Sequence, residues 1–268
     1  MFCFITSLRA PQASANWPRV CELFERTAAS VFAQTESNFR LIVAGHAPPI
    51  LRRQFDARLE FIAADLPVPN EDYYLRGADK RDKLIVGLRR ARELGAHAVM
   101  AIDADDLVSC RLAEFVLARP EIDGWHVARG FKHAYGRGWI EPIEAGFNLL
   151  CGSCNVLSRR WFAFPGDRAR EAAAERTWFD AGHDEFAHVF GALGARIEPV
   201  PFPAAVYIAN ASDGLSNSDP DARATRPPRS APRRLAGRAL LALRTIARRR
   251  PLTNKLRDEF SIAGPLAS

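Results

Sequence analysis

The stretch His97-Ala98-Val99-Met100-Ala101-Ile102-Asp103-Ala104-Asp105-Asp106 decides the fold class. After His97 the run is continuously apolar, which is typical of a strand covered on both faces. Three carboxylates then follow within four residues. In open α/β sheets, ligands bind at the carboxyl ends of the strands. The stretch therefore predicts a buried strand and places a candidate site directly after it.

The elements around this strand alternate between strand and helix. Before it, we predict strands at 2–7, 40–43 and 59–63, with helices from Asn16 to residue 32 and from about Arg81 to residue 94. After it come short strands at 125–128, 131–133, 139–140, 196–200 and 205–208, a helix at 184–193, and a small, Gly-rich segment at 149–157. The alternating order predicts an α/β fold with a mixed, largely parallel sheet flanked by helices.

The charge of the chain divides it into two parts. The formal net charge of the 268 residues is +6, yet twelve of the 37 Lys and Arg residues lie between Ala222 and Arg257, where Asp and Glu are absent. The rest of the chain holds 25 basic against 31 acidic residues, a net charge of −6. We therefore expect a body at 1–217 and, at 218–268, a Pro/Arg-rich linker with a basic amphipathic helix at 235–248. The acidic body argues against nucleic acid as a partner.

The basic helix predicts contact with an anionic membrane surface, and packing on the acidic body is the alternative. No apolar run reaches the roughly 18 residues of a membrane span. The short apolar start lacks the basic region of a signal peptide, and five cysteines do not indicate a disulfide framework. We expect a cytoplasmic protein, peripheral on the inner face of the membrane.

The crowded carboxylates favour a metal site. Asp103, Asp105 and Asp106 repel one another unless a cation neutralises them, and Mg²⁺ or Mn²⁺ prefers oxygen ligands and commonly bridges carboxylates to phosphates. All three acids are therefore candidate metal ligands. The alternative is a helix cap, because Asp105 or Asp106 could cap a helix that begins near Cys110.

These residues also carry a resemblance to a known family. The segments Ser30-Val31-Phe32-Ala33-Gln34-Thr35 and Asn38-Phe39-Arg40-Leu41-Ile42-Val43 resemble the first helix and second strand of family-2-type glycosyltransferases with the GT-A fold. Asp79-Lys80 to Gly87 and Ile102 to Asp106 are similar to the lysine-containing helix and the DxD motif of that family. The resemblance covers about residues 1–115 in consistent order and, more loosely, 145–215.

The resemblance implies a nucleotide-sugar donor. Asp103 and Asp105 would hold the metal and the ribose-diphosphate of the donor, and the metal would act as a Lewis acid on the leaving diphosphate. Where the family carries an acidic pair after its second strand, this chain has Ala44-Gly45-His46, which leaves the nucleobase open. The remaining nucleotide-binding candidates that the resemblance implies are Thr6, Ser7, Arg9, Asp79 and Lys83.

The second half of the chain offers a catalytic base. In the family, an acid at the start of a helix follows a Gly-rich acceptor segment and takes the proton of the acceptor hydroxyl. Here Gly152-Ser153-Cys154-Asn155 is followed by Gly182-His183-Asp184-Glu185-Phe186. Asp184 takes the position of the base, with Glu185 as the second candidate. Acids that offset the helix dipole at its N-terminus are the alternative.

Other motifs carry weaker signals. His183 and His188 are five residues apart rather than four, so they do not share a helix face as zinc-protease ligands do. Cys151 and Cys154 have redox spacing, but we interpret them as small residues of a substrate loop. The resemblance to enzymes with the GT-A fold makes Asn210 and Ser216 candidates for a third metal ligand or a diphosphate contact, and a role as plain turn residues is at least as good an interpretation.

With this resemblance, the sequence predicts a metal-dependent glycosyltransferase that moves a sugar from a nucleotide-sugar donor to a saccharide or lipid-linked acceptor, in bacterial envelope or exopolysaccharide assembly. Inversion is implied by the family resemblance alone. A nucleotidyltransferase of similar fold is a rival, although it would need a Gly-rich, basic phosphate loop after the first strand, where the chain has only Arg9. The other rival is a catalytically degenerate, membrane-associated scaffold. A haloacid-type phosphohydrolase is excluded, because no Asp follows the first strand.

Overall fold

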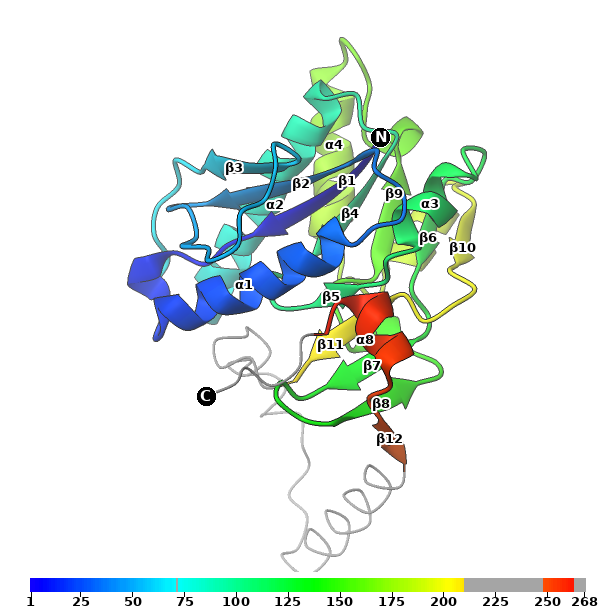
Figure 1. Cartoon of the computed structure of the whole chain (residues 1–268). Coiled ribbons are helices and arrows are strands. Elements are labelled where there is room, and N and C mark those ends of the chain that lie inside the picture. Colours follow the sequence, from blue (N-terminus) through cyan, green and yellow to red (C-terminus); the bar gives the residue numbers. More distant parts are fainter. Residues whose placement is uncertain (71, 210–247, 263–268) are drawn as a thin grey trace, which may run out of the picture.

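The computed structural model describes residues 1–70, 72–209 and 248–262. Within these residues the large sheet has seven strands in the order β3-β2-β1-β4-β9-β6-β10 (Figure 1). Strands β1 to β4 are parallel, and β9 lies antiparallel between β4 and β6. The strands are β1 (Phe2–Ser7), β2 (Phe39–Gly45), β3 (Leu59–Ala63), β4 (Ala98–Ile102), β6 (Gly124–His126), β9 (Asn155–Ser158) and β10 (Ile197–Pro199).

Helices cover both faces of this sheet. One face carries α1 (Trp17–Phe32) and α3 (Leu112–Leu117), and the other carries α2 (Tyr73–Glu93), α4 (Arg168–Phe179) and α5 (Phe186–Ala192). The predicted fold class, a mixed and largely parallel α/β sheet flanked by helices, is thereby confirmed.

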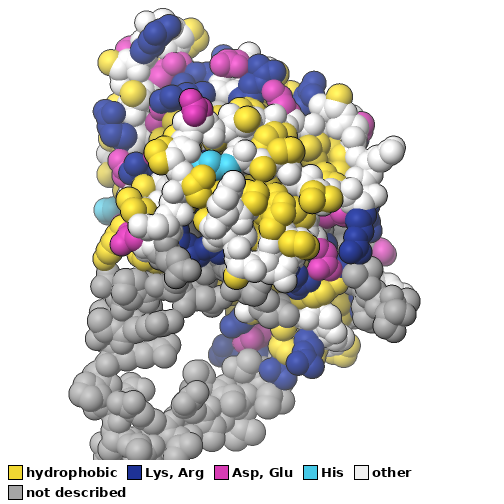
Figure 2. All heavy atoms as spheres, turned by 90° about the vertical axis from the view of Figure 1, so that its left-hand side faces the viewer, with side chains coloured by type: hydrophobic (Ala, Val, Ile, Leu, Met, Phe, Trp, Pro, Cys, Tyr) yellow, Lys and Arg dark blue, Asp and Glu magenta, His cyan; other side chains and the backbone are white. Residues whose placement is uncertain are grey.

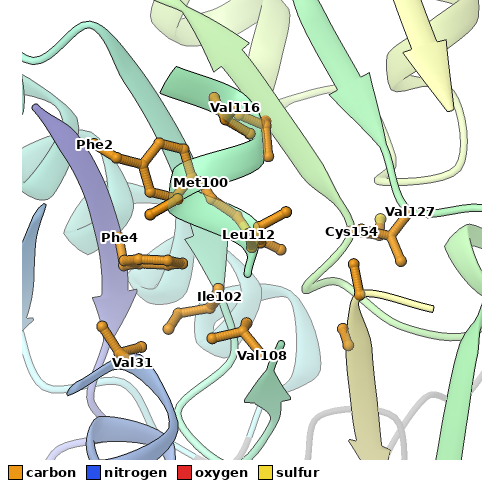
Figure 3. Packing of buried hydrophobic residues seen from close by; sticks show 14 of the residues in the cluster. Phe2, Phe4, Val31, Met100, Ile102, Val108, Leu112, Val116, Val127 and Cys154 are labelled. Atoms are coloured by element: carbon orange, nitrogen blue, oxygen red, sulfur yellow. The ribbon is translucent and has the colours of Figure 1, made fainter. Parts of the chain in front are cut away.

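Strand β1 shows how the sequence builds the two layers. Its side chains alternate between the faces, as in any strand. Phe2 and Phe4 pack in the cluster that includes Val31 of α1 (Figure 3), whereas Cys3 and Ile5 pack against α2. The four side chains are fully buried. A continuous apolar run is therefore required here, because both sides of the strand are core.

A second, smaller sheet adjoins the first. Its order is β12-β8-β7-β11-β5, and β7 pairs parallel with β11 while the other neighbours are antiparallel. The strands are β5 (Leu107–Val108), β7 (Gly130–His133), β8 (Trp139–Ile143), β11 (Ala205–Ile208) and β12 (Arg250–Pro251). Three short 3₁₀ helices complete the connections: η1 (Pro11–Ala13), η2 (Phe147–Leu149) and η3 (Arg159–Trp161).

Helix α2 begins eight residues earlier than the sequence predicted. Asp72 caps it, with its carboxylate oxygen accepting a hydrogen bond from the Leu75 N–H at 2.9 Å. The apolar periodicity begins only near Arg81 because the first two turns reach past the core. These two turns carry Asp79 and Lys80 to the carboxyl edge of the sheet. The predicted start of α1 is confirmed, since Asn16 caps it.

Strand β9 and helix α4 are among the elements that were not predicted, as are β5, β12 and α8. Strand β9 falls in the segment interpreted only as small and Gly-rich, where four buried residues insert between β4 and β6. Helix α4 lacks a clear apolar stripe, since among its residues only Glu175 and Trp178 are buried. Its place is set by ion pairs between Glu175 and two arginines of α2, Arg89 and Arg92.

The described part of the predicted tail packs against the body. Strand β12 pairs with β8, and α8 (Asn254–Phe260) buries Phe260 edge-to-face on Phe131, with ring centroids 5.6 Å apart. Glu259 accepts a backbone hydrogen bond from Cys110 and an ion pair from Arg111. Residues 248–262 therefore do not follow the predicted division at 217. The predicted basic helix, except for its last residue, lies outside the described residues, as do Asn210 and Ser216.

The carboxyl ends of β1, β2 and β3 point toward the left of Figure 1, so Figure 2 looks onto that edge of the sheet. Hydrophobic side chains gather in the centre of this face, and charged side chains lie mostly toward its margins (Figure 2). Among the described helices, none combines the length and the apolar character that crossing a membrane requires.

Candidate active site

The loop Asp103–Asp106, here called the carboxylate loop, leaves the carboxyl end of β4 beside the ends of β1 and β2. It turns back on itself, because the Asp106 N–H donates to the Asp103 carbonyl oxygen at 3.2 Å. The turn directs successive carboxylates into different surroundings. The three acids that the sequence grouped together therefore have to be considered one by one.

Asp106 faces the interior and is 1% exposed. Its Oδ1 accepts from the Ile208 backbone N–H at 3.1 Å, and its Oδ2 accepts from the Ser153 hydroxyl at 2.7 Å and the Cys151 thiol at 3.0 Å. Burial and the charges of Asp105 and Asp103 nevertheless raise its pKa well above the ordinary value. Its oxygens are directed at protein donors and join the loop to β11 and to the segment before β9. We therefore restrict the candidate metal ligands to Asp103 and Asp105.

Asp105 has the opposite character. Burial, together with the charge of Asp103, raises its pKa to about 6, although Lys80 acts against this rise. Within the described residues its side chain makes no ion pair. It lines a pocket with Arg26 of α1, His133 of β7 and Ser261 after α8. Asp105 is thus a partly buried carboxylate that makes no salt bridge with the described residues.

Asp103 is paired with Lys80. The Lys80 ammonium group donates to Asp103 Oδ1, and the Asp103 backbone N–H donates to the Ser153 hydroxyl at 2.8 Å. A Cβ at Gly152 would come within 2.9 Å of Asp103 Oδ2, so a larger residue there would require the carboxylate to shift. Burial lowers the pKa of Lys80, but the neighbouring carboxylates, Asp103 foremost, outweigh it and raise the pKa overall. Lys80 therefore stays charged.

A second ion pair lies one turn further along α2. Lys83 is completely buried, and its ammonium group donates to Asp79 Oδ2 at 2.6 Å and to the Leu8 carbonyl oxygen at 3.0 Å. Burial lowers its pKa, and the pairing with Asp79 opposes that effect. His46 Nε2 lies 2.9 Å from the Leu66 carbonyl oxygen and 3.9 Å from Asp79 Oδ1. We call His46, Asp79, Lys83 and the Leu8 carbonyl the Asp79 cluster.

The predicted nucleotide-binding residues gather at this edge but differ in access. Asp79 Oδ1 and His46 Nδ1 are buried and make no hydrogen bond. Thr6 is fully buried, and its hydroxyl is also unpaired. Ser7 and Arg9 are half-buried at the end of β1. Because Thr6 and Lys83 have no exposed surface, they support the edge from below rather than forming its surface.

The candidate bases Asp184 and Glu185 precede α5 and are both exposed. Glu185 is the N-cap residue but makes no capping hydrogen bond, so the expected capping role is not observed for it. The backbone before them is fixed: the His183 carbonyl oxygen accepts from Asn155 Nδ2 at 2.8 Å, and His183 Nδ1 lies 2.6 Å from the Asn148 carbonyl oxygen. The segment Gly152–Asn155 thus links the bases to the carboxylate loop.

Cys154 marks the point where these parts meet. Burial, and then the charges of Asp103, Asp106 and Asp184, raise the pKa of its thiol, so those acids act on one group from different elements. Both Cys151 and Cys154 are buried free thiols. Among the described residues, no group of three His, Cys, Asp or Glu side chains is arranged to hold a metal.

Sequence reasoning missed two contributors to the site. Lys80 stands in the segment that carried the family resemblance, but its partner Asp103 is 23 residues away. Ser153 lies in the predicted acceptor segment, yet its hydroxyl contacts both Asp103 and Asp106. A polar residue within a small, Gly-rich segment was the only signal, and it does not specify the partner.

No protein-family model and no curated protein matches this sequence. Similar solved structures include S. aureus TarS residues 1–349, at 12% identity and a TM-score of 0.44 over 77% of this chain and 60% of that one. The same TarS segment in complex with UDP has 12% identity and a TM-score of 0.43, covering 78% and 60%. A putative nucleotide-diphospho-sugar transferase from Desulfovibrio desulfuricans G20 has 12% identity and a TM-score of 0.41, covering 81% and 84%.

The likenesses are partial, and this chain matches only 60% of the length of the TarS segment. What the chain does has to be argued from its own residues.

Proposed function

We propose that this protein is a glycosyltransferase that moves a sugar from a nucleotide-sugar donor to a saccharide or lipid-linked acceptor. The observation that carries the proposal is that the candidate site residues gather at one edge of the sheet. There the carboxylate loop lies beside the Asp79 cluster, and the segment Gly152–Asn155 connects it to the exposed Asp184. The carboxylate loop would provide the metal and diphosphate site, the Asp79 cluster lies where the nucleoside would bind, and Asp184 would be the base for the acceptor. All three lie at the same edge of the sheet.

The residues fit a divalent cation, Mn²⁺ or Mg²⁺. Asp103 and Asp105 would hold it, since Asp105 lacks a cationic partner within the described residues and Asp106 is occupied by protein donors. Two carboxylates suffice for a cation that completes its shell with phosphate oxygens and water. When bound, such a cation supplies Lewis-acid stabilisation of the leaving diphosphate.

The chain's own residues provide the rest. Asp184 takes the proton of the acceptor hydroxyl as the acceptor oxygen bonds to the sugar and the bond to the diphosphate breaks, which gives inversion in a single displacement. The fixed carbonyl of His183 holds the backbone of Asp184 in place. Glu185, on the next residue, is the second candidate for this base.

A thermal-shift panel tests the proposal. The full chain is melted with nucleoside diphosphates and nucleotide sugars, each with and without Mn²⁺. We expect stabilisation by at least one nucleotide that needs Mn²⁺ and is lost in Asp103→Asn and Asp105→Asn. The matched control is Asp56→Asn, an exposed carboxylate that pairs with Arg58 just before β3, at the opposite edge of the sheet. Absence of any metal-dependent stabilisation would reject the transferase.

Product analysis separates the rival functions. A glycosyltransferase releases a nucleoside diphosphate, whereas a nucleotidyltransferase releases pyrophosphate from a nucleoside triphosphate. Asp184→Asn should lower kcat by about 10²- to 10⁴-fold with nucleotide binding retained, with Asp56→Asn as the matched control. A comparable loss in Glu185→Gln instead would assign the base to Glu185. A degenerate scaffold predicts that the Asp103 and Asp105 variants keep full function.

We further propose that the arginine-rich segment binds the cytoplasmic face of an anionic membrane, as expected for envelope polysaccharide assembly. Because residues 248–262 pack on the body, truncation at Asp219 would also remove α8. The sharper test replaces Arg233, Arg234, Arg238 and Arg244 by Gln in the full chain and compares flotation with anionic vesicles. Equal flotation of both proteins would reject the membrane contact.

A further inference from the structure

We propose that Lys80 is the built-in counter-ion of Asp103, and that a divalent cation reaches Asp103 only when a nucleoside diphosphate draws the ammonium group away. The inference rests on the proposed function, because it concerns the same metal and donor. It adds an order to their binding: the metal binds together with the diphosphate and not before it.

Lys80 occupies one of the two carboxylate oxygens of Asp103. Oδ1 accepts the hydrogen bond from the Lys80 ammonium group, and Oδ2 lies beside Gly152, which has no side chain. A cation that binds Oδ1, alone or together with Oδ2, therefore competes with the ammonium group.

Lys80 is able to leave. Its side chain is 35% exposed and that of Asp103 is 27% exposed, so the pair lies at the rim of the site rather than in the core. Lysine is a compact charge on a flexible four-carbon stem. By contrast, Lys83 is held by two acceptors and has no exposed surface. Only one of the two α2 lysines can exchange partners.

The charges around Asp103 favour transfer of the Lys80 ammonium group to a diphosphate over its displacement without a new partner. The carboxylate loop carries three acids, and within the described residues Lys80 is the only side chain that forms a salt bridge with them. A metal ion that displaced Lys80 without another anion present would leave an ammonium group close to a divalent cation, which is repulsive. Diphosphate oxygens remove this penalty because they accept the displaced ammonium, and lysine is a common phosphate ligand.

Loss of the Lys80 charge should raise the affinity for Mn²⁺ alone and lower the affinity for a nucleoside diphosphate. In Lys80→Met, the competitor for Asp103 is gone, so Mn²⁺ alone should bind about tenfold more tightly than to the wild type. The same variant should bind a nucleoside diphosphate at saturating Mn²⁺ about tenfold more weakly, since a charge pair with phosphate is lost. If Lys80 had only a structural role, its substitution would weaken both affinities or neither.

The experiment measures both affinities on the full chain. Free Mn²⁺ is followed by electron paramagnetic resonance in titrations of MnCl₂ alone. UDP, GDP, ADP and CDP are then titrated calorimetrically at saturating Mn²⁺. Lys80→Arg keeps the charge and should stay within about threefold of the wild type. Arg81→Met is the matched control, because it removes the neighbouring positive charge, whose partners are Asp82 and Asp180. Lys80→Gln repeats the test in case the Met variant does not fold.

The outcomes separate the two proposals. Tighter Mn²⁺ and weaker diphosphate binding in Lys80→Met, with Arg81→Met unchanged, supports the counter-ion. Metal-dependent nucleotide binding in the wild type, with Mn²⁺ affinity identical in the Lys80 variants, overturns the counter-ion and leaves the transferase standing. If neither Mn²⁺ nor any nucleotide binds to any variant, both fail.

Discussion

Two lysines one turn apart on α2 lie in opposite surroundings, and the contrast shows how one helix serves both stability and chemistry. Lys83 is fully buried in the Asp79 cluster with two acceptors. Lys80 pairs with a single carboxylate at the rim of the sheet. A buried charge has to be paired at every moment, because losing the pair costs several kcal/mol. A charge at the rim can exchange its partner, because water compensates it.

The carboxylate loop repeats the contrast between neighbouring residues. Asp106 accepts three hydrogen bonds from protein groups, and Asp105 lines the pocket without an ion pair in the described part of the chain. In both comparisons, the group with fully occupied acceptors or donors holds the architecture together. The group that lacks such partners remains available for a ligand.

The largest expected effect is that of Lys83→Met. The substitution leaves the Asp79 carboxylate largely buried without its cation and the Leu8 carbonyl oxygen without a donor. We expect a loss of about 3–5 kcal/mol in the free energy of unfolding, the range found when one partner of a buried pair is removed. Urea denaturation followed by circular dichroism measures it. A loss below about 1 kcal/mol would remove the distinction between the two lysines.

Asp106→Asn should be the next largest. The amide oxygen can keep the hydrogen bond from the Ile208 N–H, but the amide nitrogen then replaces Oδ2, so the Ser153 hydroxyl and the Cys151 thiol lose a charged acceptor and have to rotate. We expect a loss of about 1–3 kcal/mol in the same denaturation experiment. Asp105→Asn is the matched control and should not destabilise the metal-free protein. Equal losses in both variants would contradict the division within the loop.

The pH dependence of stability tests Asp105 directly. Its pKa is raised from 3.8 to about 6 by burial and by Asp103, so the folded protein favours the neutral acid. Between about pH 4 and pH 6 the folded state holds more protons at this site than the unfolded state, and stability therefore falls as the pH rises.

We expect the protonation of Asp105 to contribute on the order of 1–2 kcal/mol to the free energy of unfolding at low pH. This is less than the pKa shift alone implies, because the side chain keeps some contact with solvent. The measurement is urea denaturation with a chelator at pH 4, 5, 6 and 7, for the wild type and Asp105→Asn. In Asp105→Asn, the free energy of unfolding should fall less steeply between pH 4 and pH 6 than in the wild type. Identical slopes would show that Asp105 is not the group responsible.

The sequence was a good guide to the core and a poor one to long-range pairing. Strands β1 and β3 have the predicted bounds. For β1 the reason is that an apolar run with both faces buried allows few alternatives. Strand β9 and helix α4 escaped prediction, since one is a short strand inside a Gly-rich segment and the other is held by ion pairs with α2. The packing of Phe260 on Phe131 joins residues far apart in the chain, and composition suggested a separate tail instead.

The same limit applies to the candidate site. The sequence predicted that acids follow a buried strand and that Asp184 precedes a helix. That Asp106 is occupied could not be inferred, because its donors Cys151, Ser153 and Ile208 lie 45, 47 and 102 residues away. Carboxylates look identical in a sequence. Only the tertiary fold decides which of them meets a protein donor and which meets a ligand.

Lys80→Met should have the smallest effect on stability, and the small size is what matters. An ion pair whose members are 35% and 27% exposed contributes about 1 kcal/mol or less. The loss should therefore be several-fold smaller than that of Lys83→Met in the same buffer. If Lys80→Met instead cost about 3 kcal/mol, the ammonium group would be fixed to Asp103 as a structural partner. Exchange onto a diphosphate would then be too costly, because the protein would lose that energy each time a donor bound.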